Sequence, residues 1–218
     1  MRTRIKICGI TRVEDAATAA SLGADAVGLI FYDPSPRVVN IRQAARIADS
    51  LPALVHVVGV FVDPSEKEID AVLSEVKLTA LQFHGNESAE FCNGFGMPYI
   101  KALRMSDDAD PENYARSYPQ AWALLLDTYE SERYGGTGSA FSWERAKQCQ
   151  SSPVIIAGGI DGSNVSTALS ESGAYAVDVS SGVESSPGQK NAEKIQLFIR
   201  AVRDHDQIKR HESRPDLR

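Results

Sequence analysis

The sequence has 218 residues, of which 43% are hydrophobic and 24% charged, and its formal net charge is −6. This composition is typical of a globular protein, and the acidic balance gives no basic face for nucleic acid. No apolar run approaches the roughly 18 residues that cross a bilayer, and residues 1–10 lack the apolar core of a signal peptide. We therefore expect a cytoplasmic protein with neither nucleic-acid nor membrane partners.

The first half of the chain alternates short β-rich runs with amphipathic segments. IKIC, at residues 5–8, predicts a strand. The helix that follows is expected to have Thr11 as its N-cap, Glu14 at the capping-box spacing and Gly23 at its end. Further strands are expected at residues 24–31, 53–62 and 79–84. Further helices are expected at residues 40–51, 63–76 and 86–95.

The second half continues the same alternation. Strands are expected at residues 98–105, 121–128, 153–160 and 174–184. Helices are expected at residues 110–118, 144–151, 162–173 and 191–206. A Gly-rich segment at residues 129–143, which contains Gly135 and Gly136, interrupts the alternation and predicts a loop.

Eight strand candidates separated by helices predict the fold class. Alternating β and α elements indicate a parallel sheet with right-handed crossovers, and eight repeats favour closure into a single (β/α)8 TIM barrel. An open doubly wound sheet is the alternative. We assign residues 1–205 to one barrel domain and expect the polar residues 206–218 to form a frayed C-terminal tail.

Polar side chains are expected to gather at the carboxyl ends of four strands. Because side chains alternate across a strand, Lys6 and Cys8 share one face, and Gln82 and His84 share another. Asp127 and Asp178 also end apolar runs. Taken alone, each of these residues could simply face solvent, but together they indicate the C-terminal rim, where barrel enzymes hold their active sites.

Two glycine-containing loops after the last two strands predict a phosphate site. Gly158 and Gly159 follow the buried strand that begins at residue 153, with Ser163 or Asn164 ahead of the next helix. After the last strand come Ser180, Ser181 and Gly182. Glycine lets backbone amides approach a ligand closely, and loops after barrel strands seven and eight commonly bind phosphate. An ordinary turn is the alternative for either loop alone. Together they favour a sugar-phosphate ligand.

The motifs in chain order resemble one known family. They are KICGIT, GADAVGLIF followed by SPR, LQFHG, LLLDT, GGTG before FSW, IAGGI and DVSSGVESSPGQKN. Over about residues 5–199 the chain resembles the phosphoribosylanthranilate isomerases of tryptophan biosynthesis, a pathway of aromatic amino acids. The resemblance implies a TIM-barrel aldose-ketose isomerase without metal or organic cofactor. Its reaction is the Amadori rearrangement of N-(5-phosphoribosyl)anthranilate to 1-(2-carboxyphenylamino)-1-deoxyribulose 5-phosphate.

The resemblance also implies roles for individual residues. Cys8 matches the general base and Asp127 the general acid, while Arg37 matches the position that binds the anthranilate carboxylate. His84 and Asp178 match positions that line the substrate pocket. The phosphate is expected on Gly158, Gly159, Ser181 and Gly182. A free thiol titrates near a pKa of about 8.5, and a neighbouring cation such as Lys6 is expected to lower the pKa of Cys8.

Other readings of the sequence stay open. The alternative for Cys8 is a small apolar residue at the rim of the barrel without a catalytic role. Cys92 and Cys149 are expected to be packing or surface residues. The nearest enzyme alternative is a histidine-pathway or dual-specificity aminoaldose-phosphate isomerase, which uses two aspartates. A different class is a non-catalytic sugar-phosphate-binding barrel. The chain is expected to be a monomer or a homodimer, with a small-molecule sugar phosphate as its partner.

Small departures from the family pattern fall outside these site residues. Gln189 and Asn191 stand where the family more often has a basic and an acidic residue, and Ser142 replaces a common acid. These positions lie at a helix start or an outer loop. The departures therefore concern local capping rather than chemistry.

Overall fold

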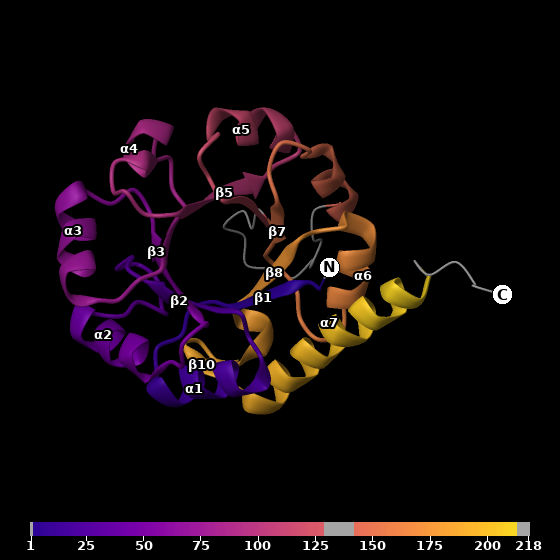
Figure 1. The fold of residues 1–218 in the computed structure, drawn as a ribbon, viewed down its shortest axis with the longest axis horizontal. Helices are drawn as coiled ribbons and strands as arrows, with labels where there is room; N and C mark the ends of the chain where they lie inside the picture. Colours follow the sequence, from indigo (N-terminus) through magenta and orange to yellow (C-terminus); the bar gives the residue numbers. More distant parts are fainter. Residues whose placement is uncertain (1, 129–141, 213–218) are drawn as a thin grey trace.

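Eight parallel strands form a closed barrel in the computed structural model, which describes residues 2–128 and 142–212 (Figure 1). The strands are β1 (Arg4–Ile7), β2 (Ala26–Ile30), β3 (His56–Phe61), β4 (Ala80–Phe83), β5 (Tyr99–Met105), β6 (Ala123–Thr128), β7 (Val154–Ile156) and β8 (Ala176–Val179). They follow one another around the barrel in chain order, and β8 pairs with β1. The expected TIM barrel is confirmed, and the open doubly wound sheet is wrong.

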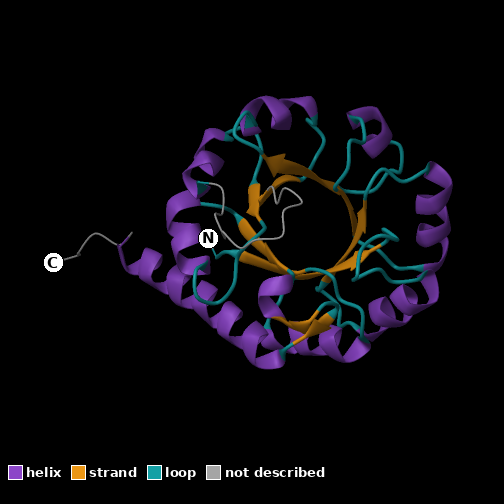
Figure 2. Ribbon diagram, turned by 180° about the vertical axis from the view of Figure 1, so that it is seen from behind, coloured by secondary structure: helices purple, strands orange, loops and turns teal. Residues whose placement is uncertain are grey.

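Helices surround the barrel on its outside (Figure 2). They are α1 (Val13–Leu22), α2 (Ile41–Ser50), α3 (Glu66–Glu75), α4 (Ala89–Asn93), α5 (Pro111–Ser117), α6 (Val165–Ser172) and α7 (Ala192–Glu212). Two 3₁₀ helices, η1 (Trp143–Gln148) and η2 (Ser181–Val183), and a hairpin of β9 (Glu184–Ser186) and β10 (Gln189–Lys190) complete the described structure. The expected loop around Gly135 and Gly136 lies outside the described residues. No helix in the described ranges is long and apolar enough to cross a membrane.

Some helix ends follow local sequence signals and others do not. Gly23 ends α1 in the left-handed conformation at φ 101°, as expected for a glycine there. The expected N-cap at Thr11 is wrong, because α1 starts at Val13 and the Thr11 hydroxyl instead donates to the carbonyl of Gly188. The tertiary bond to the β9–β10 hairpin has replaced a local cap. Asn191 accepts the Lys194 N–H, so the start of α7 is capped despite the departure from the family pattern.

Two apolar clusters fill the two sides of the barrel wall. On β6, Leu124 and Leu126 belong to the outer cluster under the helices, and Leu125 belongs to the inner one. The inner cluster is built mainly from small residues: Val58, Ala80, Ile100, Ala102, Ala123, Leu125, Ile155, Ala157 and Ala176. This alternation is the strand period of two, and it leaves the carboxyl ends of the strands free for polar side chains.

Helix α7 continues past the expected start of the polar tail at residue 206. Asp206 is buried, and its carboxylate accepts the Thr3 N–H at 2.9 Å and the Thr3 hydroxyl at 2.7 Å. The sequence around Asp206 is polar, but the Asp206 carboxylate binds Thr3, which lies 203 positions earlier in the chain. Helix α7 therefore extends the ordered part of the chain to Glu212, and residues 213–218 lie outside the described part.

Replacement of Asp206 by alanine should destabilise the protein. The Thr3 amide and hydroxyl would lose a buried partner, which costs about 1–3 kcal/mol in the free energy of unfolding. Urea unfolding monitored by circular dichroism measures this loss. A chain ending at residue 205 should lose at least as much stability. The control Asp204→Ala, at a carboxylate 58% exposed, should match wild type. Full stability of the chain ending at residue 205 would contradict the assignment.

Candidate active site

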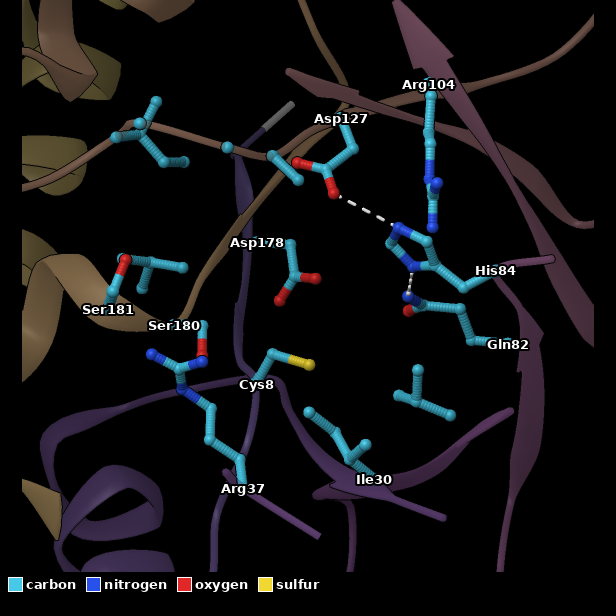
Figure 3. A pocket seen from close by; sticks show the side chains of 16 residues that line it. Cys8, Ile30, Arg37, Gln82, His84, Arg104, Asp127, Asp178, Ser180 and Ser181 are labelled. Atoms are coloured by element: carbon cyan, nitrogen blue, oxygen red, sulfur yellow. Dashed lines mark hydrogen bonds and ion pairs between the residues drawn. The ribbon is translucent and has the colours of Figure 1, made fainter. Parts of the chain in front are cut away.

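A cavity of about 500 Å³ opens at the carboxyl ends of the barrel strands (Figure 3). Its lining includes the expected residues Cys8, Arg37, His84, Asp127, Gly158, Gly159, Asp178 and Ser181. Side chains from six strands or the segments just after them therefore meet in one place, although they are up to 173 positions apart. Cys8 and Asp127 both point into this space in Figure 3.

The thiol of Cys8 stands beside a buried ion pair. Lys6 donates from Nζ to Oδ2 of Asp178 at 2.8 Å, and both side chains are at most 6% exposed. The register of β1 with β8 places Lys6 directly opposite Asp178, so the pair crosses from one strand to the next. Gly28 on β2 leaves room for this group, because a Cβ there would lie 2.7 Å from the sulfur of Cys8.

The charge around Cys8 does not lower its pKa, contrary to expectation. Burial of the thiol raises the pKa of Cys8, and the Asp178 carboxylate raises it further. Lys6 acts in the opposite direction, but its charge is balanced by Asp178. For Lys6 itself, burial lowers the pKa, but the Asp178 carboxylate and Cys8 together more than offset this and the net shift is upward. The thiol of Cys8 is therefore favoured over the thiolate at neutral pH.

The two other cysteines lie away from the cavity. Cys92 and Cys149 both belong to the outer apolar cluster, as expected for packing residues. Burial raises the pKa of Cys92 to about 12 and also raises the pKa of Cys149. Cys8 is the one described cysteine that borders the cavity.

A chain of hydrogen bonds links β4 to Asp127 on β6. Nε2 of Gln82 lies 3.0 Å from Nδ1 of His84, and Nε2 of His84 lies 3.1 Å from Oδ2 of Asp127 (dashed in Figure 3). Gln82 is almost fully buried, whereas the Asp127 side chain is 28% exposed. Asp127 therefore reaches the cavity with one oxygen bonded to His84.

The segment after His84 is anchored by a second buried ion pair. Lys101 on β5 donates to the Gly85 carbonyl at 2.7 Å and to Glu87 at 3.0 Å, and neither side chain is more than 2% exposed. The carboxylate of Glu87 also accepts the N–H groups of Asp63 and Gly85. The turn that carries His84 is thus tied to β3 and β5.

Arg37 enters the cavity from the loop after β2 with much of its guanidinium already engaged. Its Nε and Nη2 both donate to Glu184 at 2.8 Å, in a bidentate pair. Glu184 also accepts from Lys190 at 2.8 Å. Burial alone would raise the pKa of Glu184, but the bonds from Arg37 and Lys190 lower it below its usual value.

The loops after β7 and β8 form the side of the cavity next to Ser181. Gly158 and Gly159 have positive φ angles of 75° and 63°, which other residues rarely adopt. Ser181 lines the cavity, but Gly182 does not belong to the lining. A Cβ at Gly182 would lie 2.1 Å from the Ile160 carbonyl, so this glycine is required for the close packing of the two loops.

Sequence reasoning missed three charged residues at this site. Glu184 and Lys190 hold Arg37 and the segment after β8, and Arg104 on β5 lines the cavity next to Asp127 in the strand register. The only available signal for Arg104 was its position near the end of a strand. Within residues 2–128 and 142–212, no group of three or more His, Cys, Asp or Glu side chains could hold a metal ion.

Comparisons with known proteins agree with this architecture. A family model described as N-(5'phosphoribosyl)anthranilate (PRA) isomerase matches residues 5–201. An N-(5'-phosphoribosyl)anthranilate isomerase of Alcanivorax borkumensis is 49% identical over 207 residues, covering 92% of this chain and 95% of its own. The crystal structure of phosphoribosyl anthranilate isomerase from Thermotoga maritima matches with a TM-score of 0.84 and 39% identity, covering 93% of this chain and 99% of its own.

A second solved structure that matches is a complex with a ligand. It is phosphoribosyl anthranilate isomerase in complex with reduced 1-(o-carboxyphenylamino)-1-deoxyribulose 5-phosphate, and it matches with a TM-score of 0.81 and 36% identity. The match covers 93% of this chain and 99% of that one. With the family model spanning almost the whole barrel, the chain belongs to the N-(5'-phosphoribosyl)anthranilate isomerase family.

Proposed function

We propose that this protein is a phosphoribosylanthranilate isomerase that acts in tryptophan biosynthesis through the side chains of Cys8 and Asp127. The observation that carries the proposal is the meeting of a thiol, a carboxyl group and two glycine-containing loops in one cavity at the strand ends. The loops suit a phosphate, and the two side chains suit a proton donor and a proton acceptor. Membership of the family supplies the substrate, N-(5-phosphoribosyl)anthranilate.

Asp127 acts as the general acid in the first step. Opening of the ribose ring breaks the bond between C1 and the ring oxygen, and this oxygen must receive a proton as the bond breaks. A protonated Asp127 donates it and becomes a carboxylate. The product is an open-chain protonated Schiff base, whose C2 proton is now acidic.

Cys8 acts as the general base in the second step. Its thiolate removes the C2 proton, the electrons move to the nitrogen, and an enolamine forms that tautomerises to the ketone. Because burial and Asp178 raise the pKa of Cys8 in the free enzyme, only a small part of Cys8 is thiolate at neutral pH.

The remaining site residues bind the substrate in this proposal. Gly158, Gly159 and Ser181 form the phosphate site, and Gly182 supports it by letting the loop after β8 pack closely against the Ile160 carbonyl. Arg37 binds the anthranilate carboxylate with the part of its guanidinium that Glu184 leaves free, since Nη1 has no partner among the described residues. His84 and Asp178 contact the sugar.

The wider expectations remain part of the proposal. The reaction needs no cofactor, because both proton transfers are assigned to side chains of the chain. A cytoplasmic location and a monomer or homodimer remain predictions. A histidine-pathway isomerase would use an aspartate where Cys8 stands, and a non-catalytic barrel would have no need of the thiol and carboxyl group in one cavity.

The first test is the reaction itself, with wild type and Cys8→Ser compared side by side. The substrate is formed in situ from anthranilate and a phosphoribosyl donor, and its fluorescence is followed. We expect rapid loss with wild type and at least roughly 10²-fold slower loss with Cys8→Ser, because serine is a far weaker acid and forms little oxyanion. Loss at equal rates would assign the base elsewhere. No loss with wild type, while a reduced product analogue still binds, would favour the binding barrel.

Asp127→Asn should lower kcat by a factor of roughly 10² to 10⁴, since the amide keeps the shape but cannot donate the proton. The same fluorescence assay measures it under saturating substrate. Cys149→Ala is the control, because Cys149 lies outside the cavity lining, and its kcat should equal that of wild type. Turnover of Asp127→Asn at the wild-type rate would remove Asp127 from the mechanism.

Neutralisation of Asp178 should make Cys8 more reactive. The Asp178 carboxylate raises the pKa of Cys8, so Asp178→Asn should lower that pKa and move the pH midpoint of iodoacetamide alkylation downwards. The rates are measured by mass spectrometry of the Cys8 peptide, in a protein that also carries Cys92→Ala and Cys149→Ala. Asp204→Asn, on the outside of α7, should leave the midpoint in place. An upward shift with Asp178→Asn would reverse the assigned electrostatics.

A further inference from the structure

We propose that Gln82 is a positioning residue, which holds the ring proton of His84 on Nε2 and so determines which oxygen of Asp127 carries the transferable proton. The proposal rests on the proposed role of Asp127 as the general acid. Gln82 does not act on substrate in this scheme. It acts through His84, and the structure gives three observations in support.

The first observation is that the side-chain amide of Gln82 has His84 as its one hydrogen-bond partner among the described residues. Gln82 is 1% exposed, and Oε1 has no hydrogen-bond partner among the described residues. Its one side-chain bond within those ranges runs from Nε2 to Nδ1 of His84. A buried amide with an unpaired acceptor costs free energy compared with an apolar side chain of similar size. The bond to His84 gives a reason for a glutamine at this position.

The second observation is the direction of that bond. In the amide orientation of the structure, the nitrogen of Gln82 lies next to Nδ1 of His84; because this nitrogen carries hydrogens and has no lone pair to share, Nδ1 is then the acceptor. In neutral imidazole only one nitrogen carries a proton. The proton of neutral His84 is therefore on Nε2, which lies 3.1 Å from Oδ2 of Asp127 and donates to it.

The third observation concerns the two oxygens of Asp127. Oδ2 is the acceptor of the His84 N–H, and Oδ1 has no hydrogen-bond partner among the described residues. When Asp127 is protonated, the proton is thus placed on Oδ1, which is free to face the substrate. When the proton has moved to the ring oxygen, the same N–H of His84 stabilises the carboxylate that remains.

The other tautomer of His84 would oppose this transfer. With the proton on Nδ1, the lone pair of Nε2 would accept the proton of Asp127 on Oδ2 and hold it away from the substrate. After the transfer, that lone pair would face a carboxylate and repel it. In the amide orientation of the structure Gln82 opposes this tautomer, because its amide hydrogens would then meet the N–H of Nδ1.

The test begins with Gln82→Met, an apolar side chain of similar length. We expect kcat to fall roughly tenfold, the usual worth of one hydrogen bond, because the bond to Nδ1 of His84 is lost. The melting temperature should be no lower than that of wild type, since the unpaired acceptor is removed. Gln207→Met, at an exposed position on α7, is the matched control and should leave kcat, KM and melting temperature unchanged.

Two further measurements separate positioning from a structural role. On a His84→Asn background, Gln82→Met should cause no additional loss of kcat, because its effect passes through His84. In wild type, ¹⁵N NMR of the ring nitrogens should show His84 with the proton on Nε2, with the resonances assigned from the spectrum of His84→Asn. In Gln82→Met the other tautomer should appear.

Three outcomes would overturn the proposal. They are a Gln82→Met enzyme with wild-type kcat, a wild-type His84 protonated on Nδ1, and independent losses of kcat from Gln82→Met and His84→Asn. Failure of the proposed function itself has a different signature. Wild type would then leave the substrate unchanged, whereas the NMR and melting measurements would still report whether Gln82 sets the tautomer.

Discussion

The pairing of β1 with β8 is the constraint on which the rest of the site depends. It closes the barrel and sets Lys6 opposite Asp178 and Ile7 opposite Val179. Because side chains alternate along a strand, a slip of one residue would turn Lys6 and Cys8 towards the helices and bring apolar side chains into the cavity. The buried ion pair at 2.8 Å belongs to one register only, so it adds specificity to a closure that apolar packing alone would define less sharply.

The charges in and around the cavity are arranged as compensated groups. Lys6 is paired with Asp178, Arg37 and Lys190 share Glu184, and Lys101 is paired with Glu87. Desolvation makes an isolated buried charge costly, and each of these groups has its partner within 3.0 Å. A consequence is that the thiol of Cys8 experiences little net positive field. The shift in its pKa is therefore set mainly by burial, and the family position of a base does not by itself imply a thiolate at rest.

Much of the site could be predicted from the sequence, because side chains alternate between the two faces of a strand. The period of two placed Cys8, His84 and Asp178 on the inward face, and eight strand candidates were enough to infer that their ends meet. This alternation could not reveal hydrogen-bond or ion-pair partners that come from distant segments of the chain. Arg37 and Glu184 are 147 positions apart, and no local pattern connects them. The same limit explains the errors at Thr11 and at the end of α7, where bonds to Gly188 and Thr3 replaced what the local sequence indicated. The pKa of Cys8 depends on burial and on Asp178, which only the three-dimensional arrangement provides.

Gly28 shows that the position of the Cys8 thiol also depends on a missing side chain. It lies inside β2 in a run of apolar residues, and as a glycine it has no side chain that could take part in a reaction. A single methyl group at this position would lie 2.7 Å from the sulfur of Cys8 and 3.2 Å from the nitrogen of Lys6. The thiol and the ammonium group of Lys6 would then have to move from their positions beside Asp178. Repacking of the barrel interior at Gly28 would therefore disturb the surroundings of Cys8, although glycine itself has no reactive group.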